Sequence, residues 1–399
     1  MTAPRPLDGI KVLEVGQLLA GPFTGTFLGY FGAEVIKVEP PGKGDPIREW
    51  RLLDDNGTSF WWQSLGRNKK SVTANLRSAK GREVVAKLAK EADVLIENFK
   101  PGTMEKWGLG PDDLEQENPN LIYVRVSGYG QTGPYSKKPG YASVTEAFSG
   151  FRYLNGFEDR PPVRPNLSMG DTVAGLHAVL GVLMALFERK QNRGTGGQVI
   201  DVALYESMFN LMEGVLPEFD GAGAIREPSG STLTGIVPTN TYLCSDNKHV
   251  VIGANGDSIY VRLMNAIGRT DLANDPKLST NSGRVENQLE IDDAIAFWTN
   301  SRASTQVMQI LEDAEVPVGL IYNIKDMLED PHYQSRDLFE EVEVDGSALK
   351  IPAILPKLSK TPGRTNHPGP QVGSSTMSTL KELGYTEDQL NSMKNDGDI

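Results

Sequence analysis

Short apolar runs alternate with helical patterns over the first 130 residues. Four of these runs are rich in β-branched residues and are predicted to be strands: Ile10–Val15, Glu34–Val38, Asp93–Glu97 and Leu121–Ser127. The segments 21–31 and 80–91 have the spacing of apolar residues that is typical of helices. Strands that alternate with helices favour an α/β fold with a parallel sheet. Because ligands on such sheets bind beyond the carboxyl ends of the strands, functional residues are expected in the loops that follow.

The pattern changes in the second half of the chain. Residues 172–187 are apolar almost all round, which predicts a helix buried at the centre of the fold; it is too short to span a membrane, which takes about 18 apolar residues. Residues 217–235 are rich in Gly, Pro and Ser, the composition of a linker. From 241 to about 330, strand-like and helical patterns mix, which favours a smaller α+β domain. Residues 361–373 predict an extended connector, and 376–393 a last helix.

The composition narrows the class of protein. With 39% hydrophobic and 23% charged residues, the chain can bury a sizeable core. A net charge of −12 disfavours a nucleic-acid partner, because duplex binding needs a basic face. The single cysteine, Cys244, cannot form an internal disulfide, which favours a reducing compartment. The first residues lack the features of a signal or transit peptide, so we expect a cytoplasmic protein with no membrane partner.

Common cofactor and metal motifs are not favoured. Gly128, Gly130 and Gly133 form a literal GxGxxG after a predicted strand, but Pro134 follows, no helix begins there, and no acid stands about 20 residues on. A flexible loop on the substrate side is the better interpretation. The four histidines are isolated from one another and from cysteine, so no metal site is expected. GxSxG and Walker A motifs are absent from the sequence.

Asp171 stands just before the apolar segment, and two interpretations of it remain open. As an N-cap, its side chain would accept hydrogen bonds from free N–H groups of the helix. As a nucleophile, it would be kept ionised by the helix dipole and would attack an acyl group from a cleft.

Basic residues gather locally despite the acidic total. Some of these clusters fall in loops after predicted strands, where an anionic ligand would need them, although solvated surface charge is the simpler interpretation. The clusters are Arg67 with Lys69 and Lys70, Lys100 with Lys106, Lys137 with Lys138, and Arg160 with Arg164.

Together these segments resemble the class III coenzyme A transferases, a family that includes formyl-CoA transferase and carnitine CoA-transferase. The resemblance runs nearly end to end through PLDGIKVLEVGQLLAGP, GAEVIKVEPPGKGD, RNKKSVTANLRSAKG, ADVLIENFKPG, SGYGQTGPY, MGDTVAG, GQVIDVALYES and VPVGLIYNIKDMLEDPHYQSR. It implies an interlocked homodimer whose large Rossmann-like domain is built from both ends of the chain. The domains are then expected at 1–215 (large), 216–235 (linker), 236–330 (small α+β) and 331–399 (return to the large domain).

The resemblance also implies site residues. Asp171 fills the position of the family's catalytic aspartate, which attacks the donor thioester and becomes an aspartyl-CoA thioester. Coenzyme A is then a substrate, with no prosthetic group. The matching loops imply CoA contacts from Leu18, Leu19, Ala20, Lys69, Lys70, Asn98, Phe99 and Lys106.

The chain departs from its relatives at several positions. Formyl-CoA transferase has Gln in place of Leu19 and Arg in place of Pro40, and its tetraglycine loop is missing here, which argues against formyl-CoA/oxalate exchange. Related racemases need a His–Asp pair where this chain has Tyr141 and Ala142, so the racemase base is absent.

The leading hypothesis is CoA transfer from an acyl-CoA, such as succinyl-CoA, to a small carboxylic acid, such as a dicarboxylate. Arg48 and Arg164 are the candidate partners of a distal carboxylate, and Tyr141 lies on the substrate side. The alternatives are an acyl-CoA racemase or isomerase, and a CoA-binding protein without turnover.

Overall fold

The computed structural model describes residues 3–191 and 196–399, which form two compact units. The first unit contains the chain up to Phe151, then Pro165–Glu213 and Tyr333–Ile399. The second contains Arg152–Arg164 and Gly214–His332. The short stretch 152–164, assigned to the large domain from the sequence, therefore clusters with the second unit. The expected linker is not all irregular, because α10 (Val215–Ala222) begins it.

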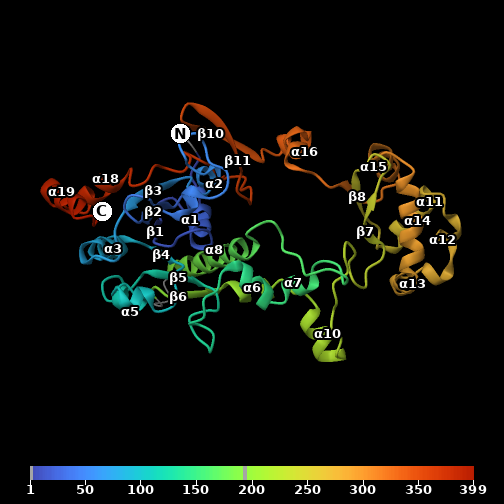
Figure 1. Ribbon diagram of the computed structural model, residues 1–399, viewed down its shortest axis with the longest axis horizontal. Helices are drawn as coiled ribbons and strands as arrows, with labels where there is room; N and C mark the ends of the chain where they lie inside the picture. Colours follow the sequence, from blue (N-terminus) through green and yellow to red (C-terminus); the bar gives the residue numbers. More distant parts are fainter. Residues whose placement is uncertain (1–2, 192–195) are drawn as a thin grey trace. The chain divides into compact units, whose positions relative to one another are not determined.

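A parallel sheet of six strands forms the centre of the first unit (Figure 1). Its order is β3-β2-β1-β4-β5-β6, and all five strand pairs are parallel. The strands are β1 (Lys11–Glu14), β2 (Glu34–Glu39), β3 (Lys69–Thr73), β4 (Val94–Glu97), β5 (Ile122–Ser127) and β6 (Val199–Ala203). The α/β prediction is confirmed, and four of these strands coincide with the predicted runs. The sequence analysis missed β3 and β6, whose apolar runs are interrupted by Lys69, Lys70 and Asp201.

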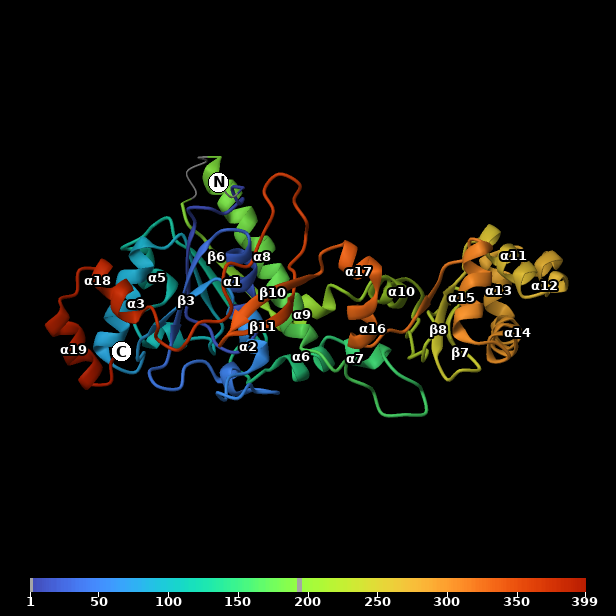
Figure 2. The ribbon, with the colours of Figure 1, turned by 90° about the horizontal axis from the view of Figure 1, so that it is seen from above.

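Helices cover both faces of this sheet (Figure 2). On one face, α1 (Ala20–Tyr30) and α8 (Met169–Lys190) pack with Val12, Val35, Val94 and Ile122. On the other lie α3 (Ala79–Glu91), α5 (Pro111–Glu115), α18 (Thr376–Glu382) and α19 (Glu387–Asn395). The last two come from the C-terminal end, which is tied to α3 by an ion pair of 2.8 Å between Lys80 and Asp396.

The sequence pattern predicts that helix α8 is buried, but in the structure only part of its surface is buried. It spans 22 residues, long and apolar enough by length and composition to cross a membrane. One stripe, with Ala174, Ala178 and Val182, is buried on the sheet, whereas Leu180 and Met184 on another stripe are 53% and 65% exposed. An apolar composition does not show which face a sheet covers, and that is why the prediction was wrong.

The remaining elements of the first unit are short. They are η1 (Pro46–Glu49), α2 (Phe60–Leu65), α4 (Thr103–Lys106), α6 (Ala142–Phe148), α9 (Leu204–Phe209) and the hairpin of β10 (Phe339–Val344) and β11 (Ser347–Pro352).

The second unit has a three-stranded antiparallel sheet and a core of its own. Its strands are β7 (Thr239–Leu243), β8 (His249–Gly253) and β9 (Val318–Leu320). Its main helices are α11 (Asp257–Ala266), α12 (Thr270–Asn274), α13 (Asn281–Glu286), α14 (Gln288–Asn300), α15 (Ser304–Asp313) and α16 (Ile324–Glu329). Two short helices, α7 (Phe151–Leu154) and α17 (Pro331–Ser335), lie where the chain passes between the units. Arg284 is fully buried and donates to the carbonyl of Asn255 and the carboxylate of Asp257, so it holds the loop before α11 in place.

Candidate active site at the carboxyl edge of the sheet

The order of the strands places the topological switch point between β1 and β4. From β1 the chain continues to β2 and β3 on one side, and from β4 it continues to β5 and β6 on the other side. Ligands of such sheets bind where the direction changes, at the switch point beyond the carboxyl ends of the strands. The loop 15–19 follows β1, and Asn98 follows β4. The Asn98 side chain accepts a hydrogen bond from the backbone N–H of Gln17 (2.8 Å) and donates one to its carbonyl (2.7 Å). Two segments that the sequence analysis assigned to CoA binding therefore meet at the switch point.

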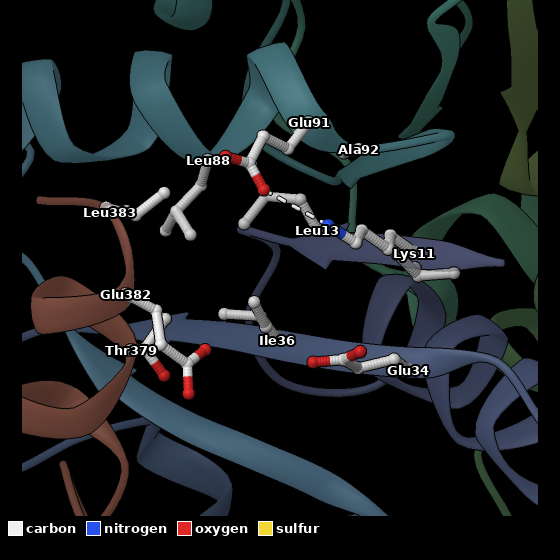
Figure 3. A pocket seen from close by; sticks show the side chains of 11 residues that line it. Lys11, Leu13, Glu34, Ile36, Leu88, Glu91, Ala92, Thr379, Glu382 and Leu383 are labelled. Carbon is white, nitrogen blue, oxygen red and sulfur yellow. Dashed lines mark hydrogen bonds and ion pairs between the residues drawn. The ribbon is translucent and has the colours of Figure 1, made fainter. Parts of the chain in front are cut away.

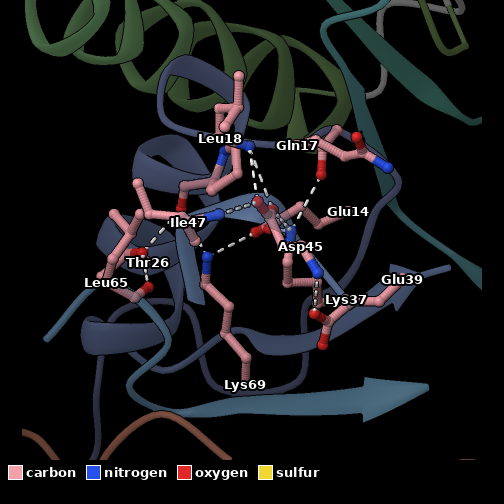
Figure 4. Close-up of polar contacts among 12 residues, drawn as sticks. Glu14, Gln17, Leu18, Thr26, Lys37, Glu39, Asp45, Ile47, Leu65 and Lys69 are labelled. Carbon is pink, nitrogen blue, oxygen red and sulfur yellow. Dashed lines mark hydrogen bonds and ion pairs between the residues drawn. The ribbon is translucent and has the colours of Figure 1, made fainter. Parts of the chain in front are cut away.

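Asp45, which follows β2, also holds this loop (Figure 4). Its two carboxylate oxygens lie 3.0 and 3.1 Å from the backbone nitrogen of Leu18, which donates to them. Leu18 has a φ of 65°, a left-handed conformation that is costly for a branched side chain. Asp45 offsets this cost with a charge-assisted hydrogen bond, so the loop has a defined conformation before any ligand arrives.

A cluster of buried charges lies beneath this loop (Figure 4). Lys37 is fully buried, and its Nζ lies 2.8 Å from Asp45 and 2.9 Å from Glu14. Burial opposes the charge of Lys37, but Asp45 and Glu14 outweigh it and raise the pKa of Lys37. Lys69 lies 2.8 Å from the other oxygen of Glu14, and burial lowers the pKa of Lys69 to about 8. Each of these charges is compensated inside the protein.

This cluster changes the interpretation of Lys69 and Arg48. The Nζ of Lys69 donates to the carbonyl of Pro22 and pairs with Glu14, so in this structure it joins α1 to the end of β1, and its contact with CoA stays a prediction. Arg48 is 5% exposed, donates two hydrogen bonds of 2.7 Å to Glu39 and one of 2.8 Å to the carbonyl of Pro370, and stacks on Trp62. Arg48 is therefore a structural clamp, and the prediction that it binds a substrate carboxylate is not supported by this geometry.

Lys70 lies at the opposite edge of the sheet. Its Nζ pairs with Glu34 at 2.6 Å, and Glu34 begins β2 at the amino edge. In a strand, neighbouring side chains point to opposite faces, which separates Lys70 from Lys69. The first exposed basic residue after the carboxyl end of β3 is Arg77, which the sequence analysis did not consider.

Helix α8 brings Asp171 to the same edge as the loop 15–19. Arg189, at the end of the helix, donates to Asp93 and to the carbonyl of Asn120, which precede β4 and β5 at the amino edge. The helix therefore starts at the carboxyl edge. One turn after Asp171, a Cβ built on Gly175 would lie 2.7 Å from the ring of Phe23 and 3.2 Å from the carbonyl oxygen of Ala20, so glycine favours this close approach of α1.

Asp171 is not the N-cap that one interpretation of the sequence suggested. Ser168 is the N-cap, and Asp171 lies in the first turn of α8, partly exposed. The helix dipole still favours its ionised form there. A carboxylate in this position can therefore face both the helix terminus and a substrate.

Two further predicted residues lie on neighbouring segments. Phe99 packs edge-to-face on Trp107, and its backbone N–H donates to Glu97, which burial holds at a pKa of about 7. Lys106 is exposed on α4, next to Glu105. Arg125 of β5 joins these pieces through ion pairs of 2.9 Å to Glu97 and 2.6 Å to Glu105.

The other predicted residues have different settings. Leu19 and Ala20 are buried, and the Leu19 side chain packs with Trp62 inside the protein. Tyr141 is the N-cap residue of α6 and is 73% exposed. Arg164 belongs to the second unit, and its part in binding the acceptor stays a prediction.

Comparisons with known proteins agree with this geometry. The chain matches CoA-transferase family III over residues 7–376. The chain belongs to this family. It is 46% identical to the succinyl-CoA–D-citramalate CoA-transferase of Chloroflexus aurantiacus, over 97% of this chain and 96% of that protein. It is 32% identical to the human succinyl-CoA:glutarate CoA-transferase, over 96% and 87%. The crystal structure of a CAIB/BAIF family protein from Brucella suis superposes with a TM-score of 0.83 at 32% identity, over 96% of this chain and all of that one.

Membership of CoA-transferase family III makes this protein an enzyme, a CoA-transferase. Thioesters of coenzyme A are thus its substrates, as predicted. The expectation drawn from the sequence motifs is confirmed at the level of the family and of the reaction class.

Proposed function

We propose that the enzyme transfers coenzyme A from succinyl-CoA to a small dicarboxylate through an aspartyl-CoA thioester on Asp171. The observation that carries the proposal is the position of Asp171: it lies in the first turn of α8, which begins at the carboxyl edge and packs closely on α1, the helix that follows the loop fixed at the switch point. The relatives support the substrates, because those named above take CoA from succinyl-CoA to citramalate or glutarate, and others to malate.

The chemistry follows from a carboxylate nucleophile. The Asp171 carboxylate attacks the thioester carbonyl, and CoA leaves as the thiolate, which gives a succinyl–aspartyl anhydride. The thiolate then attacks the aspartyl carbonyl and releases succinate. The acceptor carboxylate displaces CoA from this aspartyl thioester, and the thiolate attacks the acceptor's carbonyl in the new anhydride. The aspartate is regenerated, and no proton or electron is left over.

The geometry of the loop suits the first of these steps. Asp45 and Asn98 fix the backbone of Gln17 and Leu18, so the loop is ordered before the thioester binds. A site that is ordered in advance spends less binding energy on arranging itself. Since Arg48 is occupied by Glu39, we do not assign the distal carboxylate of the acceptor to Arg48.

We also propose that the enzyme is an interlocked homodimer in the cytoplasm. The exposed stripe of α8 with Leu180, Met184 and Phe187 supports this, because the same helix packs on the sheet through its opposite side and a second copy would bury the stripe. Cys244 is free and buried, in keeping with a reducing compartment. Light scattering should give twice the chain mass of 43.5 kDa, and the mass of one chain would contradict the dimer.

An acceptor screen tests the function. The enzyme is incubated with succinyl-CoA and citramalate, malate, glutarate or acetate, and CoA esters are identified by mass spectrometry. We expect a new dicarboxyl-CoA and an equal amount of succinate. Transfer to acetate alone would contradict the dicarboxylate assignment, and the absence of any new ester across a broad acid panel would contradict succinyl-CoA as the donor.

A further inference from the structure

Helix α6 places a buried carboxylate at the start of α8, the helix that carries Asp171. Glu146 is 0% exposed, and its Oε1 accepts a hydrogen bond of 3.2 Å from the backbone N–H of Gly170. Gly170 is the residue immediately before Asp171, so this contact reaches the chain one peptide bond away from the proposed nucleophile. No motif in the sequence points to Glu146.

The first turn of α8 needs such a partner. The first N–H groups of any helix lack acceptors within the helix, and the N-cap Ser168 makes no side-chain hydrogen bond to them. Glu146 supplies an acceptor from another helix. The fit is close, because a Cβ built on Gly170 would lie 3.2 Å from the Cβ of Ala142 and 3.4 Å from Glu146. Gly170 thereby lets α6 and its carboxylate approach the backbone.

We propose that Glu146 is a positioning residue for Asp171. Its hydrogen bond fixes the peptide before residue 171, and the direction of the Asp171 side chain follows from that backbone. A nucleophile that is misdirected by a fraction of an ångström loses rate, whereas the binding of a thioester at the loop 15–19 is left intact. This inference rests on the proposed role of Asp171.

Three variants separate this role from a general effect on folding. Glu146→Ala removes the acceptor, and Glu146→Gln keeps an amide oxygen that can accept the same hydrogen bond. Ser149→Ala is the matched control: the Ser149 hydroxyl is buried in the same region and donates to the backbone carbonyl of Glu146 without reaching Gly170.

The kinetic result expected is a fall in kcat with little change in KM. For Glu146→Ala we expect kcat to fall about 10- to 100-fold, the effect of a small misplacement of a reacting group, with KM for succinyl-CoA within about twofold. Glu146→Gln should recover most of this loss, and Ser149→Ala should stay near wild type. A Glu146→Gln variant as slow as Glu146→Ala, or a Glu146→Ala variant with normal kcat, would overturn the proposal.

Hydrogen exchange tests the same contact without any activity. Amide exchange of the peptide that contains Gly170 and Asp171 should accelerate in Glu146→Ala and stay slow in Ser149→Ala and Glu146→Gln. Unchanged exchange in Glu146→Ala would overturn the proposal. If Glu146→Ala does not fold, the kinetics and exchange of Glu146→Gln decide alone, because this variant must keep both near wild type. If the wild type transfers no CoA but exchange follows the expected order, the proposed function fails and the contact stands.

Discussion

The two edges of the six-stranded sheet carry charges in opposite ways. Towards the carboxyl edge, the buried amines of Lys37 and Lys69 reach Glu14 and Asp45, and each charge is paired (Figure 4). At the amino edge, the charges surround a cavity of about 70 Å³ between β1, β2, α3 and α18 and remain in contact with solvent (Figure 3). Lys11 pairs there with Glu91 at 3.1 Å, and both side chains are about half exposed.

This difference separates charges that hold the backbone in position from charges that are solvated at the surface. A buried ion pair is costly to form and costly to break, so it fixes the segments that it joins. A surface pair contributes little, since water and salt compete with it. At the carboxyl edge, Asp45 ties the buried charges to the backbone of the loop 15–19 through Leu18. We therefore expect substitutions there to change catalysis and stability, and substitutions at the amino edge to change neither.

The largest effect is expected at Asp171. Asp171→Asn keeps the size of the side chain but removes the nucleophilic oxyanion, so kcat should fall by about 10³-fold or more while the fold survives. Incubation of the wild type with succinyl-CoA and hydroxylamine should convert residue 171 to its hydroxamate, detected in a tryptic peptide. If the variant transfers CoA at the normal rate and no adduct forms, the covalent mechanism is wrong.

The next largest effect is expected at Asp45. Asp45→Ala removes one of the two carboxylates beside Lys37 and frees the backbone of Leu18, which should cost about 3 kcal/mol of unfolding free energy. KM for succinyl-CoA should rise because the loop loses its fixed conformation. Asp45→Asn keeps an acceptor for Leu18 and is the control, with a smaller rise in KM. Urea unfolding and initial rates measure both, and a normal KM in a folded Asp45→Ala variant would show that the loop is held without Asp45.

The sequence predicted the sheet better than the environment of its charges. β-branched runs identified β1, β2, β4 and β5, because buried parallel strands leave an apolar signal. Lys69 and Lys70 concealed β3, since two lysines suggest a surface loop, although in the fold one is buried and the other exposed. Burial of a charge depends on partners that lie far away in the sequence, such as Glu14, and no local pattern shows them.

The candidate site was predicted in the same uneven way. Asp171 and the loops at 18–20 and 98–99 followed from motifs, and the structure brings these segments to one edge. Arg48 was assigned to the substrate because of its charge type alone, whereas its partners Glu39 and Trp62 are evident only from the fold. The N-cap interpretation of Asp171 was wrong, because the N-cap is Ser168, three residues earlier. Helix boundaries are the least certain feature of a sequence pattern.

A moderate effect on the pH dependence of stability is expected at Glu97. Burial raises the pKa of Glu97 from 4.5 to about 7, so the folded state holds this proton while the unfolded state has lost it. The folded state is therefore favoured less as pH rises from 4.5 to 7, by at most about 1.4 kcal/mol per pH unit. Glu97→Gln cannot titrate, and its unfolding free energy relative to wild type should rise across this window and level off above it. A constant difference from pH 5 to pH 8 in urea unfolding would contradict the raised pKa.

The smallest effect is expected at Lys70, and its neighbour Lys69 provides the matched comparison. Lys70→Met removes an exposed pair with Glu34 at the amino edge, so the unfolding free energy should change by about 0.5 kcal/mol or less. KM for succinyl-CoA should be unchanged, since Lys70 does not reach the carboxyl edge.

Lys69→Met makes the same chemical change one residue earlier, but it leaves Glu14 with Lys37 as its one remaining lysine partner. It should therefore destabilise the protein by about 2 kcal/mol or more, because it breaks a buried pair. Urea unfolding and initial rates of the two variants measure this contrast. A severalfold higher KM in Lys70→Met would return Lys70 to the CoA site, and equal unfolding free energies would mean that burial of the Lys69 charge contributes nothing to the fold.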